Sequence, residues 1–231
     1  MRLRRATAVG AWIVLGLGFS SRGQDLPPAF PREGATQVLD NAWGTAWDVT
    51  WAPNMPTAMH RHAYDYVGVE LVDSTFNLTA PSGQPRTSSL KKGDCYFLPK
   101  GITHIEEGLS SNPPRHAILI DLKDSRPPSP DNTTGYPTAF PRDAAKKIVD
   151  NQRVTMWDYT WTPGQTAPTY FYEKAAFTIF VDDGQLNLTG PDGKSEVRVF
   201  NAGQILFTPG GTARSEEAMK NAVHAIIIEL K

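Results

Sequence analysis

Cysteine is almost missing from this sequence, and so are long hydrophobic runs and any excess of one charge. The single cysteine, Cys95, excludes an intrachain disulfide, so packing must stabilise the fold. The formal net charge of −1 gives no electrostatic basis for binding nucleic acid or an anionic membrane surface. The apolar run at 11–19 is far shorter than the ~20 residues of a membrane-spanning helix. We therefore expect no nucleic-acid partner and no membrane span in the mature chain.

The first residues have the order of a secretory signal peptide. Arg2, Arg4 and Arg5 precede the apolar run, and polar residues follow it at once. We predict a signal peptide over residues 1–24, a mature chain that begins near Gln24, and a secreted or periplasmic location. An uncleaved anchor is the alternative, because no clean small-x-small cleavage site is visible.

The remaining chain contains an internal repeat with an offset of 110 positions. Ala-Phe-Pro-Arg at 29–32 recurs at 139–142, and Trp-Asp-x-Thr-Trp at 47–51 recurs at 157–161. The same offset relates the glutamate pairs at 106–107 and 216–217. This pattern indicates duplication of a whole domain. We predict one domain over 25–123, a proline-rich linker over 124–138 and a second domain over 139–231.

Each copy has the pattern of short strands separated by turns. Trp47, Val49 and Trp51 alternate with polar residues, and Pro-x-Gly turns occur at 81–83 and 191–193. The chain holds 19 glycines and 19 prolines, which suits many turns. The closing strands, 115–122 and 223–230, are apolar enough to be buried on both faces. The sequence therefore predicts an all-β protein of two barrels or jelly rolls.

Three of the five histidines stand at informative spacings in the first copy. His60 and His62 are two residues apart, so on a strand both point to the same face. Gly93, Pro99 and Gly101 then precede His104, where tight turns can aim a third imidazole.

These segments resemble the two signature motifs of the cupin superfamily, HxHxxxE and GxxxxxPxGxxH. The second motif matches at every fixed position, whereas Tyr66, after Asp65, stands where the first has glutamate. The resemblance covers both copies and implies two tandem double-stranded β-helix (jelly-roll) barrels. It also implies one divalent metal ion held by His60, His62 and His104. Imidazole ligands suit Fe, Zn, Mn, Cu or Ni.

The second copy has lost all three of these ligands. At the offset of 110, the histidines become Tyr170, Tyr172 and Arg214, so we expect no metal there. These side chains either pack the barrel interior or bind a small anion or a sugar hydroxyl. His116 and His224, and Glu106 with Glu216, recur in both copies, which indicates structural roles. Cys95 aligns with Ile205 and is expected to be a buried thiol.

Two functions follow from this reading. The first is an exported metalloenzyme that converts a small molecule, an Fe(II)-dependent dioxygenase or else a lyase or isomerase, with Tyr66 and Asp65 as catalytic candidates. Cupin dioxygenases with three-histidine sites act on thiols and diketones. The alternative is a noncatalytic bicupin that binds a sugar or anion or serves as structure. The second copy is expected to stabilise the first. The Trp-rich strands either form the contact between the two copies or belong to the core of their own copy. Formation of a homo-oligomer stays open.

Overall fold

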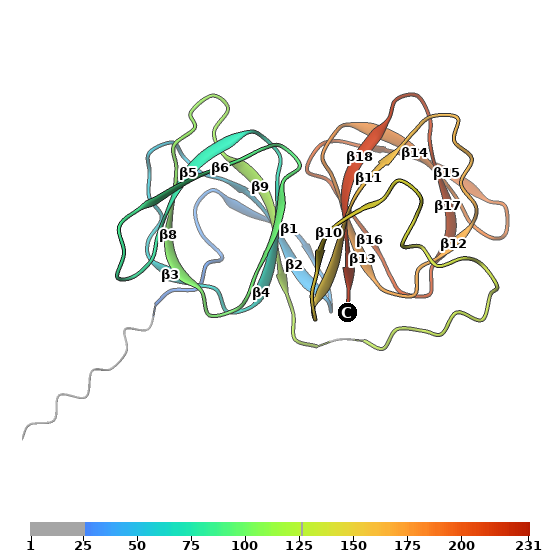
Figure 1. Ribbon diagram of the computed structural model, residues 1–231, viewed down its shortest axis with the longest axis horizontal. Coiled ribbons are helices and arrows are strands. Elements are labelled where there is room, and N and C mark those ends of the chain that lie inside the picture. Colours follow the sequence, from blue (N-terminus) through green and yellow to red (C-terminus); the bar gives the residue numbers. More distant parts are fainter. Residues whose placement is uncertain (1–25, 126) are drawn as a thin grey trace, which may run out of the picture.

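The computed structural model describes residues 26–125 and 127–231 and contains two β-barrels side by side (Figure 1). The predicted signal peptide lies outside the described residues. Within them, no helix is long and apolar enough to cross a membrane. The all-β prediction is confirmed.

The first barrel is built from two antiparallel sheets. The larger has the strand order β1-β2-β9-β4-β7 and the smaller β3-β8-β5-β6. The Ser74–Thr79 hairpin strand pairs with Arg86–Leu90 across the predicted turn at 81–83. The nine strands are β1 (Ala35–Asp40), β2 (Gly44–Thr50), β3 (His60–Arg61), β4 (Asp65–Glu70), β5 (Ser74–Thr79), β6 (Arg86–Leu90), β7 (Cys95–Leu98), β8 (Thr103–Gly108) and β9 (His116–Leu122).

The second barrel repeats this topology. Its sheets have the orders β10-β11-β18-β13-β16 and β12-β17-β14-β15, so each strand takes the place of the strand nine labels earlier. The duplication seen in the sequence is therefore a duplication of the fold. Its strands are β10 (Lys146–Asp150), β11 (Val154–Trp161), β12 (Tyr170–Phe171), β13 (Ala176–Phe180), β14 (Gly184–Thr189), β15 (Ser195–Phe200), β16 (Ile205–Thr208), β17 (Ala213–Ala218) and β18 (Val223–Leu230). The linker bounds, 124–138, stay a prediction.

The Trp-rich strands serve their own barrels. Trp47 and Trp51 belong to the core inside the first barrel, and Trp157 and Trp161 to the core inside the second. In the first barrel, Phe30 stacks on Trp47 with ring centroids 4.9 Å apart. The tryptophans thus pack in each barrel's own core, while Ala46 and Met156 on the same strands belong to a core between the barrels.

The larger sheets pack against each other and form a third core between the barrels. It is contributed by residues that alternate with the interior ones, such as Ala46 beside Trp47 and Met156 beside Trp157. A Cβ at Gly203 would lie 2.9 Å from the Leu71 side chain of the other barrel, so that side chain packs directly against the Gly203 backbone. The buried members are Ala46, Val67, Val69, Leu71, Ile118, Ile120, Leu122, Val154, Met156, Ala175, Phe177, Ile179, Val181, Ile226, Ile228 and Leu230.

Ion pairs also join the two barrels. Arg153 Nε lies 3.1 Å from Asp65 Oδ2, and Lys92 Nζ lies 2.6 Å from Asp182 Oδ1. Arg153 also donates hydrogen bonds to the carbonyls of Leu122 and Lys123. The closing strands β9 and β18 are thus buried on both faces, as their apolar sequences predict.

Candidate metal centre

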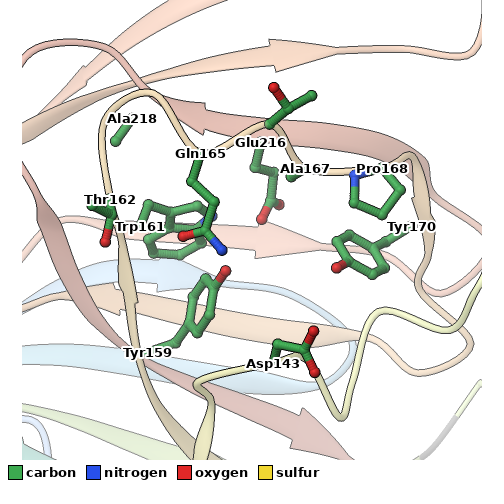
Figure 2. Close-up of a pocket in the computed structure, with 11 residues that line it drawn as sticks. Asp143, Tyr159, Trp161, Thr162, Gln165, Ala167, Pro168, Tyr170, Glu216 and Ala218 are labelled. Carbon is green, nitrogen blue, oxygen red and sulfur yellow. The ribbon is translucent and has the colours of Figure 1, made fainter.

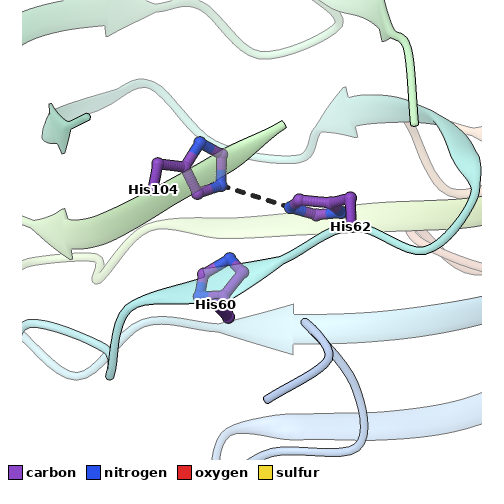
Figure 3. A group of neighbouring side chains, drawn as sticks. All are labelled: His60, His62 and His104. Carbon is purple, nitrogen blue, oxygen red and sulfur yellow. Dashed lines mark hydrogen bonds between the residues drawn. The ribbon is translucent and has the colours of Figure 1, made fainter. Parts of the chain in front are cut away.

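The three predicted metal ligands lie together inside the first barrel. His60 on β3 pairs in register with His104 on β8, and His62 follows β3 on the same face (Figure 3). All three side chains are buried, and one ring nitrogen from each lies within 4.8 Å of the other two. The ring centroids are 4.9 to 5.2 Å apart. Strand alternation and the turn at residues 100–101 thus bring the imidazoles together.

The hydrogen bonds of the rings suit metal ligation. His60 Nδ1 lies 2.9 Å from the Ala58 carbonyl oxygen and donates to it, which leaves the lone pair on Nε2. His60 Nε2 is buried and has no hydrogen-bond partner among the described residues. His62 Nε2 and His104 Nε2 face each other at 3.2 Å (Figure 3). Three nitrogen donors in one buried cluster fit a divalent metal ion.

Burial keeps these imidazoles neutral, which is the state that binds metal. It lowers the pKa of His62 to about 3 and shifts the pKa values of His60 and His104 in the same direction. Glu106 opposes this shift in all three rings, and the neighbouring histidines reinforce it in His62. No proton has to leave the cluster near neutral pH before a metal binds.

The structure separates the two predicted catalytic residues. Tyr66 stacks on His62, with ring centroids 4.0 Å apart, and burial raises the pKa of its phenol. Asp65 points to the opposite face of β4, where it pairs with Arg153 and accepts a hydrogen bond from the Lys100 backbone N–H. The structure therefore brings Tyr66 to the histidines and places Asp65 at the contact between the barrels.

Glu106 is a site residue that the sequence reasoning missed. It lies two residues after His104 on β8, and its Oε1 is 3.7 Å from His104 Nε2. Its Oε2 accepts hydrogen bonds from Arg32 at 2.6 Å and from Trp51 Nε1 at 3.1 Å. Burial would raise its pKa, but Arg32 and Arg115 hold it well below the ordinary value. Glu106 is thus an ionised carboxylate beside the cluster. Its position two residues after His104 on a strand could have predicted this, because residues two apart lie on the same face.

A largely apolar cavity of about 560 Å³ leads to the histidines. His60 and Trp51 line it, together with proline and alanine side chains from the segments 27–34 and 50–58. Arg32 is the cation in this wall. Its Nη2 donates to Glu106, whereas its buried Nη1 has no hydrogen-bond partner among the described residues. The cavity wall therefore holds a guanidinium that Glu106 fixes in place and that has one nitrogen without a protein partner among the described residues.

The equivalent place in the second barrel holds an ion-pair network. Glu216 Oε1 accepts hydrogen bonds from Tyr172 Oη at 2.6 Å and Arg214 Nε at 2.8 Å. Its Oε2 accepts from Arg142 Nη1 at 2.7 Å. Two of the three residues that replace histidines thus bind Glu216, and Tyr170 lines a small cavity in front of it.

The recurring histidines and the cysteine lie outside the cluster, as expected. His116 Nε2 bonds to Asp48 at 2.6 Å, and His224 Nε2 to Asp158 at 2.8 Å. Cys95 is partly buried, and burial raises the pKa of its thiol to about 12. These residues have structural hydrogen bonds or an inert thiol.

Comparisons with known proteins identify similar chains. No protein-family model matches this chain. The β-alanine degradation protein BauB of Pseudomonas aeruginosa is 38% identical over 74 residues, which is 32% of this chain and 77% of that protein. AerE from Microcystis aeruginosa has a similar fold, with a TM-score of 0.60 and 15% identity over 85% of this chain and 90% of that chain.

Two further solved structures show the same fold over most of the chain. A cupin 2 conserved barrel domain protein from Leptotrichia buccalis has a TM-score of 0.56 and 13% identity, covering 85% of this chain and 88% of that chain. Oxalate decarboxylase of Lactobacillus farciminis has a TM-score of 0.58 and 11% identity, covering 87% and 82%. At these identities the likeness is one of fold.

Proposed function

This chain belongs to the cupin superfamily, and from that premise we propose that its first barrel is a metal-dependent enzyme that acts on a small organic acid. The observation that carries the proposal is the meeting of three neutral imidazoles beside an apolar cavity that His60 and Arg32 line. We further propose that residues 1–24 direct export of the chain. No activity depends on the second barrel in this proposal.

His60, His62 and His104 would hold one divalent metal ion. Three protein ligands leave coordination positions open, and a metal bound there supplies Lewis-acid or redox chemistry. Glu106 is the carboxylate nearest to this centre, and its pKa keeps it negatively charged. Its charge favours a cation among the histidines. Tyr66 covers one face of the His62 ring and holds that ring in place.

Arg32 determines the substrate class in this proposal. Its Nη1 is a buried donor without a protein partner among the described residues, and Glu106 fixes the guanidinium through Nη2. A carboxylate oxygen satisfies such a donor with a charge-assisted hydrogen bond. The apolar walls suit a hydrocarbon body and exclude water from the reacting end. The relative BauB is named for degradation of β-alanine, a small carboxylic acid, which supports this class.

Metal analysis of the purified full chain tests the first step. We expect about one divalent metal ion per chain in the wild type and almost none in His104→Ala, because that variant loses one of three protein ligands. His116→Ala is the matched control, since it removes an imidazole that lies outside the cluster. Equal metal content in wild type and His104→Ala would contradict the site.

Turnover of small organic acids, followed by product analysis and dioxygen uptake, tests the second step. In Arg32→Lys, which keeps a positive charge beside Glu106, we expect KM for the acid to rise about tenfold or more. Its metal content should stay at the wild-type level. If acids bind to the metal-loaded protein without turnover, the chain is the noncatalytic binding protein instead.

A further inference from the structure

The second barrel contains a cavity of its own, of about 120 Å³ (Figure 2). Tyr159, Trp161 and Tyr170 supply aromatic walls, and Glu216, Asp143 and the loop residue Gln165 supply polar groups. Figure 2 shows these side chains converging on one space, with Gln165 reaching over it. The volume is below the roughly 300 Å³ at which sites for drug-sized ligands begin, so an occupant must be smaller.

The first barrel shows what is unusual about this cavity. Trp51 Nε1 donates to Glu106 Oε2 at 3.1 Å. Trp161 and Glu216 occupy the corresponding positions in the second barrel, yet Trp161 Nε1 is buried and has no hydrogen-bond partner among the described residues. Trp161 is only 4% exposed. An indole N–H buried in a cavity wall without an acceptor costs free energy, and an acceptor from a ligand removes that cost.

The ion-pair network explains why this indole lost its acceptor. Tyr172 and Arg214 both bond to Glu216 Oε1, and Arg142 bonds to Oε2. Burial would raise the pKa of Glu216, but the two arginines lower it to about 2, so the carboxylate stays ionised. Glu216 is thus held by three side chains of the network, and Trp161 does not bond to it as Trp51 bonds to Glu106.

The charges around the cavity exclude anions. Its charged lining residues are the acids Asp143 and Glu216. Arg142 uses its N–H groups on the Ala139 carbonyl, Glu216 and Tyr172. Arg214 donates to Glu216 and Thr208, and the ion pairs with Glu216 offset part of the positive charge of the two arginines. An anion in the cavity would therefore lie against two carboxylates, while both arginines lie behind Glu216 and do not line the cavity.

An organic cation fits the acids and the aromatic rings but leaves the indole donor unsatisfied, because an ammonium has no lone pair to accept. A hydroxyl group donates and accepts, so it can bond to Trp161 and to the carboxylates alike. The C–H face of a polyol or sugar can pack on the tyrosine rings. We propose that the second barrel binds a small polyhydroxylated molecule, such as a polyol or a monosaccharide, through Trp161.

Nuclear magnetic resonance of the full chain gives a site-specific test, because each of the six tryptophans contributes one indole N–H signal. The probes are glycerol and xylose, with ethylammonium and acetate as the cationic and anionic alternatives. Single Trp→Phe variants assign the signals. We expect glycerol or xylose to shift the Trp161 indole signal saturably and to leave the Trp51 signal in place, because Trp51 already donates to Glu106.

Calorimetry with the same probes measures affinity. Trp161→Phe should weaken polyol binding about two- to tenfold, the effect of one net hydrogen bond. Trp157→Phe is the matched control, since its indole bonds to Glu229 away from the cavity. Gln165→Ala on the exposed loop gives a second variant if Trp161→Phe does not fold. The proposal is overturned if neither polyol shifts the Trp161 signal, if only ethylammonium or acetate binds, or if Trp161→Phe binds polyols as the wild type does.

Discussion

The two barrels share one topology but neutralise their buried glutamates in different ways. In the second barrel, Arg142 and Arg214 both bind Glu216. In the first barrel, Glu106 has an ion pair with Arg32 and lies beside His104, which stands where the second barrel has Arg214. The glutamate and one arginine are thus common to both barrels, while the position that holds Arg214 in the second barrel holds a neutral imidazole in the first. This difference teaches that loss of the histidines is coupled to gain of a built-in cation.

Copying the second barrel into the first gives the largest expected effect. The double variant His62→Tyr with His104→Arg should bind no metal, because only His60 is left of the cluster. It should still fold, because the introduced tyrosine and arginine can bond to Glu106 as Tyr172 and Arg214 bond to Glu216. Metal analysis and urea denaturation check both outcomes. Retained metal, or failure to fold, would break the proposed equivalence.

A second difference between the barrels is a buried ion pair. Arg115 Nη2 lies 2.6 Å from Glu70 Oε1, and Ser74 also donates to Glu70. The corresponding residues of the second barrel are Val223, Phe180 and Gly184, where a Cβ on the glycine would lie 2.5 Å from Val223. The same place in the fold is therefore filled either by charges or by apolar side chains.

Removing one partner of this pair is expected to cost about 3 to 5 kcal/mol of unfolding free energy, because it leaves a charge buried alone. Glu70→Gln tests this by urea denaturation. The triple variant Glu70→Phe, Ser74→Gly and Arg115→Val copies the second barrel and should recover most of the loss. A single variant as stable as the wild type would show that the pair contributes nothing to stability.

The parts predicted from sequence rest on local patterns. Strand alternation placed His60 and His62 on one face, and the offset of 110 revealed the duplicated fold. The rest depended on long-range pairing. Arg32 reaches the site from an extended segment in which Pro28 bridges to Arg61. Asp65 was a candidate because it adjoins Tyr66, yet successive strand residues face opposite sides.

Glu106 shows a limit of reasoning from repeats. Its recurrence as Glu216 suggested a structural role alone, but the structure places it against His104 as well as Arg32. The glutamate recurs in both copies because its arginine partner, Arg32 or Arg142, also recurs. In the first barrel it can still act on the histidines, which the second barrel lacks. The sequence also did not predict which residues form the contact between the barrels. These residues alternate with the interior residues along the same strands, so both sets are apolar.

The smallest expected effect concerns a feature that both barrels share, a tryptophan that donates to a partly buried acid. Trp47 Nε1 lies 3.1 Å from Asp121 Oδ2, and Trp157 Nε1 lies 2.7 Å from Glu229 Oε2. Burial raises the pKa of Asp121 to about 6 against the bond from Trp47, and it raises the pKa of Glu229 as well. Since the raised pKa belongs to the folded state, each acid favours folding below its ordinary pKa and loses that contribution as pH rises through the raised value.

Asp121→Asn and Glu229→Gln keep an acceptor for the indole but carry no charge. Asp121→Asn should therefore increase the unfolding free energy at pH 8 by roughly 1 to 2 kcal/mol, a figure reduced for the partial exposure of this acid, and Glu229→Gln should act in the same direction. At pH 4 the gain should be much smaller, because the folded wild type is then protonated at these positions. Urea denaturation at both pH values measures the difference. If the unfolding free energy rises equally at both pH values, the increase comes from packing and not from the charge. If it rises in one variant alone, the two barrels differ in this feature too.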